Sequence, residues 1–167
     1  MNNFVPLRIV SDYSFLQSGL TMERIKMGVM KNKYYGLGLA DVGVMYGVPA
    51  FVKLAEDLKL PYICGMEITF NDDVLCLYVK NESGYRHLMK ITTAYHNDTF
   101  DEKLLKRYSD GLICVIETTN AHFKQLFTKD QQKLNKRLFK YDVLFKNNFY
   151  LGISVTSKEG IQYANEL

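Results

Sequence analysis

The chain has 167 residues, of which 47% are hydrophobic and 23% are charged, and its formal net charge is +3. These values are typical of a soluble globular protein that forms one ordinary domain and needs no disulfide bonds for stability. No run of eighteen apolar residues occurs, and residues 1–14 lack the basic start and the long apolar run of a secretion signal. The sequence therefore excludes a membrane-spanning helix, and we expect a cytoplasmic protein.

The first predicted element is an apolar, β-branched run at residues 4–10, which has the length of a buried strand. Thr21 is the expected N-cap of a helix that ends near residue 33, and a second short strand follows at residues 35–41. Pro49 suits the first turn of the next helix. The spacing predicts an inner face for that helix made of Phe51, Leu54, Ala55 and Leu58.

The rest of the chain continues with strands and helices in alternation. Two strands joined by a polar turn at residues 71–73 predict a hairpin or a sheet corner. The remaining predictions are strands at 62–70, 74–79, 112–116 and 149–155, and helices at 82–95, 101–107, 120–127, 130–145 and 158–167. The inward residues of the helix at 82–95 are expected to be Tyr85, Leu88, Met89 and Thr92.

This order of elements predicts an α/β protein with a largely parallel sheet. The pattern alone fits a closed barrel and an open sheet equally well. No repeat, low-complexity tract or flexible linker divides residues 1–167, so one domain is expected. The pattern stops without a closing strand, which indicates a piece of a longer protein.

The three cysteines, Cys64, Cys76 and Cys114, are far apart and lie in apolar, strand-like runs. A metal or redox motif would place them in close pairs. We therefore expect buried, reduced thiols.

Three segments taken together resemble a known family. They are FVPLRIVSDYS at residues 4–14, LADVGVMYG at 39–47, and CGME at 64–67, downstream of Pro61. In this order they resemble the PHP (polymerase and histidinol phosphatase) domain, in the form that begins the bacterial DNA polymerase III alpha subunit. The stretch LCLYVKNESGYRHLMKITTAY at 75–95 and the Asp110-Gly111 pair strengthen the match to the polymerase form.

The resemblance implies a distorted (βα)7 barrel of the PHP type with its metal ligands at the C-terminal ends of the strands. The 167 residues would be an incomplete barrel at the N-terminus of a longer polymerase subunit. Active relatives hold two or three metal ions with histidines and carboxylates, beginning with a His-x-His at the end of the first strand. The matching positions are occupied here by Arg8, Val10, Gln17, Asp41, Val42 and Glu67.

These residue types do not suit a multinuclear metal site. Arg8 is always protonated and Val10 has no donor atom, so the His-x-His pair is missing. Only Asp41 and Glu67 remain as hard ligands, and two carboxylates would hold at most one weakly bound Mg²⁺-type ion. We therefore expect no catalytic residue and no metal or other cofactor in this fragment, whereas the parent polymerase would use Mg²⁺ elsewhere.

Arg8 suggests what replaced the metal. Alternate residues of a strand face the same side, so Arg8 and Val10 are predicted to point into the same mouth. Our hypothesis is that the Arg8 guanidinium pairs with Asp41, Glu67 or both. The alternative is that Arg8 extends to solvent.

The remaining polar residues near these motifs have ordinary structural explanations. Tyr13 and Ser14 could touch a phosphate in an active relative, but capping and packing are expected here. Gly43 and Gly47 are read as turn glycines, because no phosphate-binding glycine pattern surrounds them. The histidines are expected to be surface or partly packed side chains. They are His87, His96 and His122.

Basic residues crowd one region at helical spacings. A solvated helix face is the favoured interpretation, and a nucleic-acid-binding patch is the weaker one. The residues are Lys124, Lys129, Lys133, Lys136, Arg137, Lys140 and Lys146.

The expected function is that of a catalytically inactive structural and interaction module of a DNA-directed DNA polymerase, a nucleotidyltransferase that acts in chromosome replication. The implied partners are the remainder of the polymerase subunit and other replisome proteins, including a proofreading exonuclease in some lineages. DNA would be bound by the parent and not by this fragment alone. The alternative is a metal-dependent phosphoesterase or 3′–5′ exonuclease domain.

Overall fold

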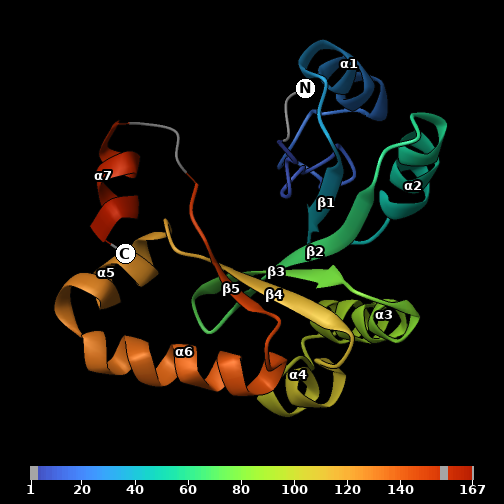
Figure 1. Cartoon of the computed structure of the whole chain (residues 1–167). Coiled ribbons are helices and arrows are strands. Elements are labelled where there is room, and N and C mark those ends of the chain that lie inside the picture. Colours follow the sequence, from blue (N-terminus) through green and yellow to red (C-terminus); the bar gives the residue numbers. More distant parts are fainter. Residues whose placement is uncertain (1–3, 155–157, 167) are drawn as a thin grey trace. The chain divides into compact units, whose positions relative to one another are not determined.

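The computed structural model describes residues 4–154 and 158–166. It contains helices and strands in alternation (Figure 1), and their bounds follow. The helices are α1 (Met22–Asn32), α2 (Val48–Asp57), α3 (Glu82–His96), α4 (Glu102–Tyr108), α5 (Ala121–Lys129), α6 (Gln131–Phe145) and α7 (Lys158–Glu166). The strands are β1 (Leu37–Val42), β2 (Tyr62–Phe70), β3 (Asp73–Val79), β4 (Leu112–Glu117) and β5 (Phe149–Gly152).

The five strands form one sheet in the order β1-β2-β3-β4-β5. β1 and β2 are parallel, and so are β4 and β5. The predicted α/β class with parallel pairs is therefore confirmed. The expected ends of the last strand, at residue 155, and of the last helix, at residue 167, lie outside the described residues.

The chain divides into two compact units, which are described separately. The first unit comprises residues 1–68 and 76–112, and the second comprises residues 69–75 and 113–167. The first unit contains β1, β2 and helices α1 to α4. The second contains β5 and helices α5 to α7.

Side-chain caps fix the helix starts, and the predicted cap at Thr21 is confirmed. Thr21 accepts a hydrogen bond from the backbone N–H of Arg24 at the start of α1. In the second unit, the side chains of Asn120 and Asp130 cap α5 and α6 in the same way.

The turn between β2 and β3 follows the polar sequence at residues 71–73. Asn71 and Asp72 have φ values of 49° and 66°. A positive φ at both central residues is typical of the tight turn that joins two antiparallel strands, and Asn and Asp tolerate it best after Gly. The predicted hairpin is confirmed.

The core of the first unit lies under α1, α2 and the first two strands. Phe51 and Ala55 are fully buried, as the spacing of α2 predicts, and Leu54 is buried beside them. The prediction for α3 is partly wrong. Met89 is 42% exposed, and Ile91 and Ala94 occupy the buried stripe together with Leu88.

The prediction of a buried first strand at residues 4–10 is wrong. Within the described chain this segment is extended and makes one isolated bridge, between Ile9 and Leu39. Ile9 is buried, whereas Phe4 and Leu7 are 56% and 51% exposed. Pro6 has no N–H to donate, so it contributes only its carbonyl, which accepts from the N–H of Gly38 at 2.8 Å. The segment therefore lies along one edge of β1 without forming a regular strand.

The three cysteines are buried thiols, as expected. Burial raises the pKa of Cys64 to about 11, so this thiol stays protonated at neutral pH. Across the part of the chain that the structure describes, no helix has the length and apolar character needed to cross a bilayer.

Candidate functional site

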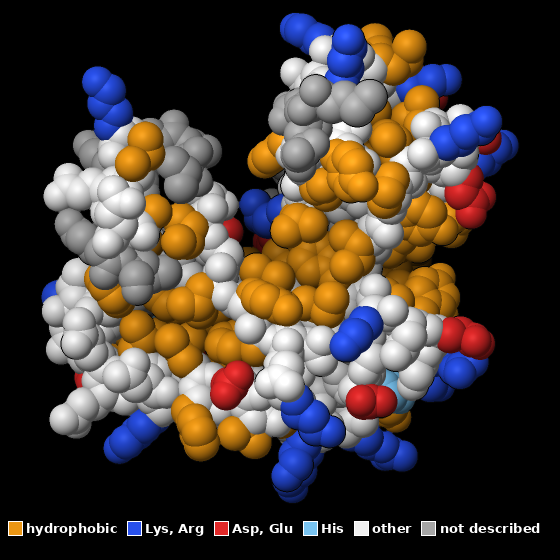
Figure 2. Space-filling view, in the orientation of Figure 1, with side chains coloured by type: hydrophobic (Ala, Val, Ile, Leu, Met, Phe, Trp, Pro, Cys, Tyr) orange, Lys and Arg blue, Asp and Glu red, His pale blue; other side chains and the backbone are white. Residues whose placement is uncertain are grey.

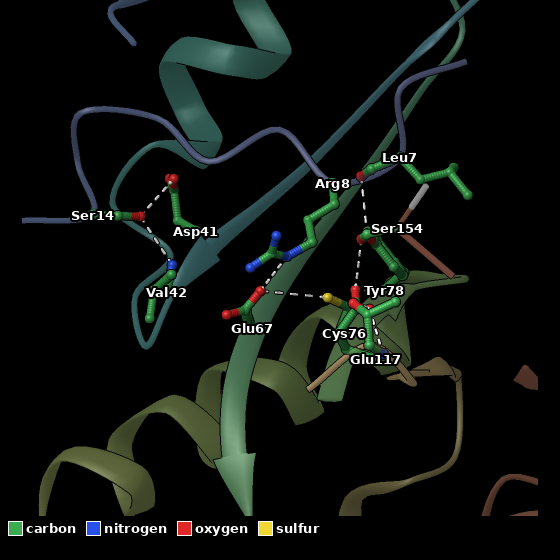
Figure 3. A network of polar contacts seen from close by, with 11 residues as sticks. Leu7, Arg8, Ser14, Asp41, Val42, Glu67, Cys76, Tyr78, Glu117 and Ser154 are labelled. Carbon is green, nitrogen blue, oxygen red and sulfur yellow. Dashed lines mark hydrogen bonds and ion pairs between the residues drawn. The ribbon is translucent and has the colours of Figure 1, made fainter. Parts of the chain in front are cut away.

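The candidate site lies in the first unit, where the end of β1 and Glu67 of β2 lie next to the N-terminal segment (Figure 3). The two strands are parallel, with Asp41 paired with Met66 and Val42 paired with Glu67 in the register. The carboxyl end of β1 therefore lies beside Glu67, three residues before the end of β2, and forms an edge with the loop that follows β1. In α/β proteins such an edge, together with the loops after it, is where binding sites are usually built.

Arg8 forms an ion pair with Glu67 through its Nε atom, as the dashed line in Figure 3 shows. The Arg8 side chain is 44% exposed, whereas that of Glu67 is only 11% exposed. The hypothesis that Arg8 pairs with Glu67 is thus confirmed. The same Glu67 oxygen lies 3.8 Å from the Sγ atom of Cys76, a weak donor from β3. A cation from the chain itself therefore neutralises the Glu67 carboxylate of β2.

Asp41 is fully buried and takes its hydrogen bonds from the loop after the N-terminal segment. Its Oδ1 atom accepts from the Ser11 N–H at 2.6 Å and from the Ser14 hydroxyl at 2.9 Å. The Ser11 hydroxyl lies 2.9 and 2.8 Å from the two carboxylate oxygens. Ser14 Oγ also accepts from the Val42 N–H at 2.9 Å. Asp41 therefore fixes this loop to the end of β1, which agrees with a capping role for Ser14.

The loop that contains Gly47 also packs closely against the Asp41 carboxylate. A Cβ atom on Gly47 would lie 2.4 Å from Asp41 Oδ2 and 2.9 Å from Ser11 Oγ. Glycine is needed at this position because of the space and not because of the backbone angles, since φ is −72°. Gly43, by contrast, has a φ of +71° and is a turn glycine as predicted.

A second contact holds the N-terminal segment from β3. The hydroxyl of Tyr78, which is buried, donates to the Leu7 carbonyl at 3.0 Å. Burial is the main cause that raises the pKa of Tyr78, so the phenol remains a hydrogen-bond donor at all physiological pH values. This contact was not predicted, because it joins residues 71 positions apart in the sequence.

Removal of the Ser11 hydroxyl is expected to lower the free energy of unfolding by about 1–3 kcal/mol, because the buried Asp41 carboxylate loses a hydroxyl donor that lies within hydrogen-bond distance of both its oxygens. Urea unfolding of the Ser11→Ala chain measures this loss. Ser18→Ala is the matched control, since Ser18 Oγ only accepts from the Leu20 N–H, at 3.1 Å in a turn. Equal stability of the Ser11→Ala and unmodified chains would contradict the anchoring role of Asp41.

The other predicted site residues offer nothing to a metal ion. Val10 and Val42 are partly buried and have no donor atom, and Gln17 is exposed on the loop. Within residues 4–154 and 158–166, no group of three or more His, Cys, Asp and Glu side chains is placed to hold a metal ion. The residues at these positions therefore do not fit the multinuclear centre that the family resemblance implies.

The Lys-Asn-x-x-Gly motif at residues 80–84 has a structural explanation. Asn81 caps α3 by accepting from the Gly84 N–H at 2.9 Å. The Lys80 N–H donates to the Gly111 carbonyl, also at 2.9 Å. A Cβ atom on Gly84 would lie 1.9 Å from that carbonyl oxygen. The motif and the Asp110-Gly111 pair are thus one packed joint between the start of α3 and the turn before β4.

Two of the three histidines are partly packed and the third, His96, is exposed, as expected. The ring of His87 lies 2.8 Å from the Asp110 carbonyl and 5.3 Å from the Tyr108 ring centroid. The side chain of His122, at the start of α5, contacts Arg137. That contact was not predicted.

The assignment of Arg137 to a solvated helix face is wrong. Its side chain is only 16% exposed and forms an ion pair with the buried Asp73. The lysines of the same region are exposed, and Phe139 and Val143 are exposed among them. Figure 2 shows basic and hydrophobic side chains mixed along α6.

A family model described as "PHP domain" matches residues 6–156. This match agrees with the resemblance carried by the three N-terminal motifs.

Curated relatives are named DNA polymerase III subunit alpha. The protein from Borreliella burgdorferi is 25% identical over 99% of this chain, and the protein from Halalkalibacterium halodurans is 27% identical over 98%. The chain spans only 17% and 16% of the length of these two relatives.

One solved structure that is similar to this chain is described as a "putative metal-dependent phosphoesterase" from Bifidobacterium adolescentis. It aligns with a TM-score of 0.57 over 97% of this chain and 81% of that protein, at 10% sequence identity. At this identity the likeness shows the fold alone. It confirms the predicted fold class, and the five-stranded sheet is compatible with part of a PHP-type barrel.

Proposed function

This chain belongs to the PHP domain family, and from that premise we propose that it is a non-catalytic structural and interaction domain of a DNA polymerase III alpha subunit. The parent protein would carry out DNA-directed DNA synthesis, with its Mg²⁺-dependent chemistry in other parts of the subunit. The domain would provide a surface on which other parts of the subunit pack, and it would not catalyse a reaction itself.

The proposal rests on the contacts that the two remaining acids, Asp41 and Glu67, make with other side chains. The Glu67 carboxylate pairs with Arg8, and the Asp41 carboxylate accepts from Ser11 and Ser14. A metal ion at either acid would compete with these contacts, and among the described residues no imidazole is grouped with the two acids to offset the loss. The arrangement supports an ion pair in place of a metal centre.

Metal analysis combined with a phosphatase assay tests the proposal. The 167-residue chain is expected to retain no stoichiometric Mn²⁺ or Zn²⁺ after dialysis and to show no turnover with either ion. The triple variant Arg8→His, Val10→His and Val42→His is expected to gain metal binding, because it restores the three missing imidazoles. The matched control places Gln at the same three positions and is expected to bind no metal.

Stoichiometric metal in the unmodified chain would overturn the proposal, and so would phosphatase or exonuclease turnover that is lost in Asp41→Ala. Those outcomes would favour the second candidate, a metal-dependent phosphoesterase or 3′–5′ exonuclease domain. The fold shared with the Bifidobacterium adolescentis protein favours this second candidate. Failure of the triple-His variant alone to bind metal would mean that these positions are not former ligand positions.

The partners of the proposed module are the rest of the polymerase subunit and other replisome proteins, among them a proofreading exonuclease, in the cytoplasm. DNA is not expected to bind this fragment by itself. A DNA affinity that falls steeply with salt would instead indicate a binding surface on the lysines of residues 124–146.

A further inference from the structure

Four side chains of the second unit form a cluster that the proposed function does not use. Arg137 on α6 holds two neighbours at once. Its Nε atom lies 2.6 Å from Asp73 Oδ2 at the start of β3, and its Nη1 atom lies 2.5 Å from Nε2 of His122 in the first turn of α5. Tyr141, one turn further along α6, donates its hydroxyl to the same Asp73 oxygen at 2.8 Å.

The contact between Arg137 and His122 defines the protonation state of the imidazole. Arginine carries only donors, so Nε2 of His122 must be the acceptor, and the ring must be neutral with its proton on Nδ1. A proton on Nε2 would bring two N–H groups and two positive charges into contact. The position near the N-terminus of α5 adds to this effect, because the helix dipole there also disfavours positive charge.

The charged and titratable groups around the imidazole come from two other elements. Arg137 on α6 opposes protonation of His122 through direct contact, and the Asp73 carboxylate on β3 favours it from behind the guanidinium. Tyr141 is a neutral donor, because burial and the nearby Asp73 carboxylate raise the pKa of its phenol. The contact with Arg137 is the only hydrogen bond described for the imidazole in the structured part of the chain, so it decides the outcome.

The second oxygen of Asp73 offers the Arg137 guanidinium another acceptor. The residue is fully buried, and within the described chain its Oδ1 atom has no hydrogen-bond partner. Buried carboxylate oxygens are rarely left unpaired, because the desolvation is costly. Arginine prefers to bind a carboxylate through two parallel hydrogen bonds, one to each oxygen. In the structure Arg137 contacts His122 through Nη1 and Asp73 through Nε, and within the described residues Oδ1 remains unpaired.

We propose that Arg137 is a two-position, pH-sensitive latch between α5 and α6. With His122 neutral, Arg137 bridges Asp73 and His122 and ties the first turn of α5 to α6. With His122 protonated, the imidazole leaves, Arg137 turns to bind both oxygens of Asp73, and the start of α5 is released. Histidine is the side chain whose charge ordinarily changes between about pH 5 and 8, so pH is the variable with which the latch is tested. The proposal does not depend on the function proposed above.

NMR spectroscopy of the 167-residue chain between pH 8 and pH 5 tests the latch. At pH 8 the ¹⁵N shifts of His122 are expected to show a protonated Nδ1 and an unprotonated Nε2. The guanidinium signals of Arg137 are expected to move with the titration of His122. Amide exchange in the first turn of α5, corrected for intrinsic pH dependence, is expected to be about tenfold faster at low pH, as for the loss of one hydrogen bond to a charged group.

Two variants make the result specific. In His122→Gln the amide oxygen can accept from Arg137 but does not titrate, so the pH-dependent shift and the change in exchange should both be lost. His96→Gln removes an exposed histidine of the first unit and should leave both unchanged. A proton on Nε2 of His122 at pH 8, or Arg137 signals that do not follow His122 in the unmodified chain, would overturn the proposal.

Discussion

Replacement of Arg137 by Met is expected to lower the free energy of unfolding by about 3–5 kcal/mol, because it leaves a buried carboxylate without its cation. The Asp73 side chain is only 1% exposed, and the Tyr141 hydroxyl would be its one remaining donor. Methionine keeps most of the volume of the arginine stem, so the loss reports mainly on the charge. Urea unfolding followed by circular dichroism measures the effect.

The loss should also depend on pH. Burial is the main cause that raises the pKa of Asp73, and the Tyr141 hydrogen bond and the Arg137 charge lower it in part. Without Arg137 the pKa must rise further. A carboxyl group with a raised pKa binds its proton more tightly in the folded state than in the unfolded state, so it adds stability as the pH falls through the folded pKa. The difference between Arg137→Met and the unmodified chain should therefore be largest at neutral pH and shrink on acidification.

Two further variants define the outcome. Lys136→Met changes an exposed neighbour on the same helix and should stay within about 0.5 kcal/mol of the unmodified chain. The double variant Asp73→Asn with Arg137→Met removes both charges and should recover part of the loss. A stability of Arg137→Met equal to that of the Lys136→Met control would contradict a structural role for the pair.

Replacement of Gly84 by Ala is expected to destabilise the first unit by at least about 3 kcal/mol, the upper end of the usual cost of overpacking. The new Cβ would lie 1.9 Å from the Gly111 carbonyl oxygen and 2.6 Å from its carbonyl carbon. These are backbone atoms, so no rotamer change can relieve the clash. The joint between α3 and the turn before β4 would have to open, with loss of the Lys80 N–H bond to Gly111.

Gly28 provides the matched control on α1. It is also a helical glycine, but a Cβ there meets nothing within 4 Å. Gly28→Ala should therefore stabilise the chain by about 0.5–1 kcal/mol through higher helix propensity. Opposite signs for the two substitutions in urea unfolding are the expected result. A neutral or stabilising Gly84→Ala would show that the contact with Gly111 is looser than described.

Local signals in the sequence predicted the helices and most strands well. Thr21, Asn120 and Asp130 act as caps within three residues of their partners, and the turn at Asn71 and Asp72 needs no distant contact. Such features depend on the backbone next to them, so a single sequence is enough to place them.

Features that depend on distant parts of the chain were predicted less well. Arg137 looks like its lysine neighbours in the sequence, because its partner Asp73 is 64 positions away, at the start of β3. Residues 4–10 have the composition of a strand, but pairing along one side only leaves them irregular. Arg8 was predicted to meet an acid because the family resemblance placed three strand ends together. Composition alone would not have brought it to Glu67.

The pair formed by Arg8 and Glu67 also limits how this domain can change over evolutionary time. A single Arg8→His substitution would remove the cation beside a largely buried acid, while Val10 and Val42 would still supply no ligand. That intermediate would lack both the ion pair and the metal ion, so it would be less stable than either end state. If these positions are former ligand positions, as proposed, metal binding would therefore require several substitutions made together, and the ion pair would oppose each single step.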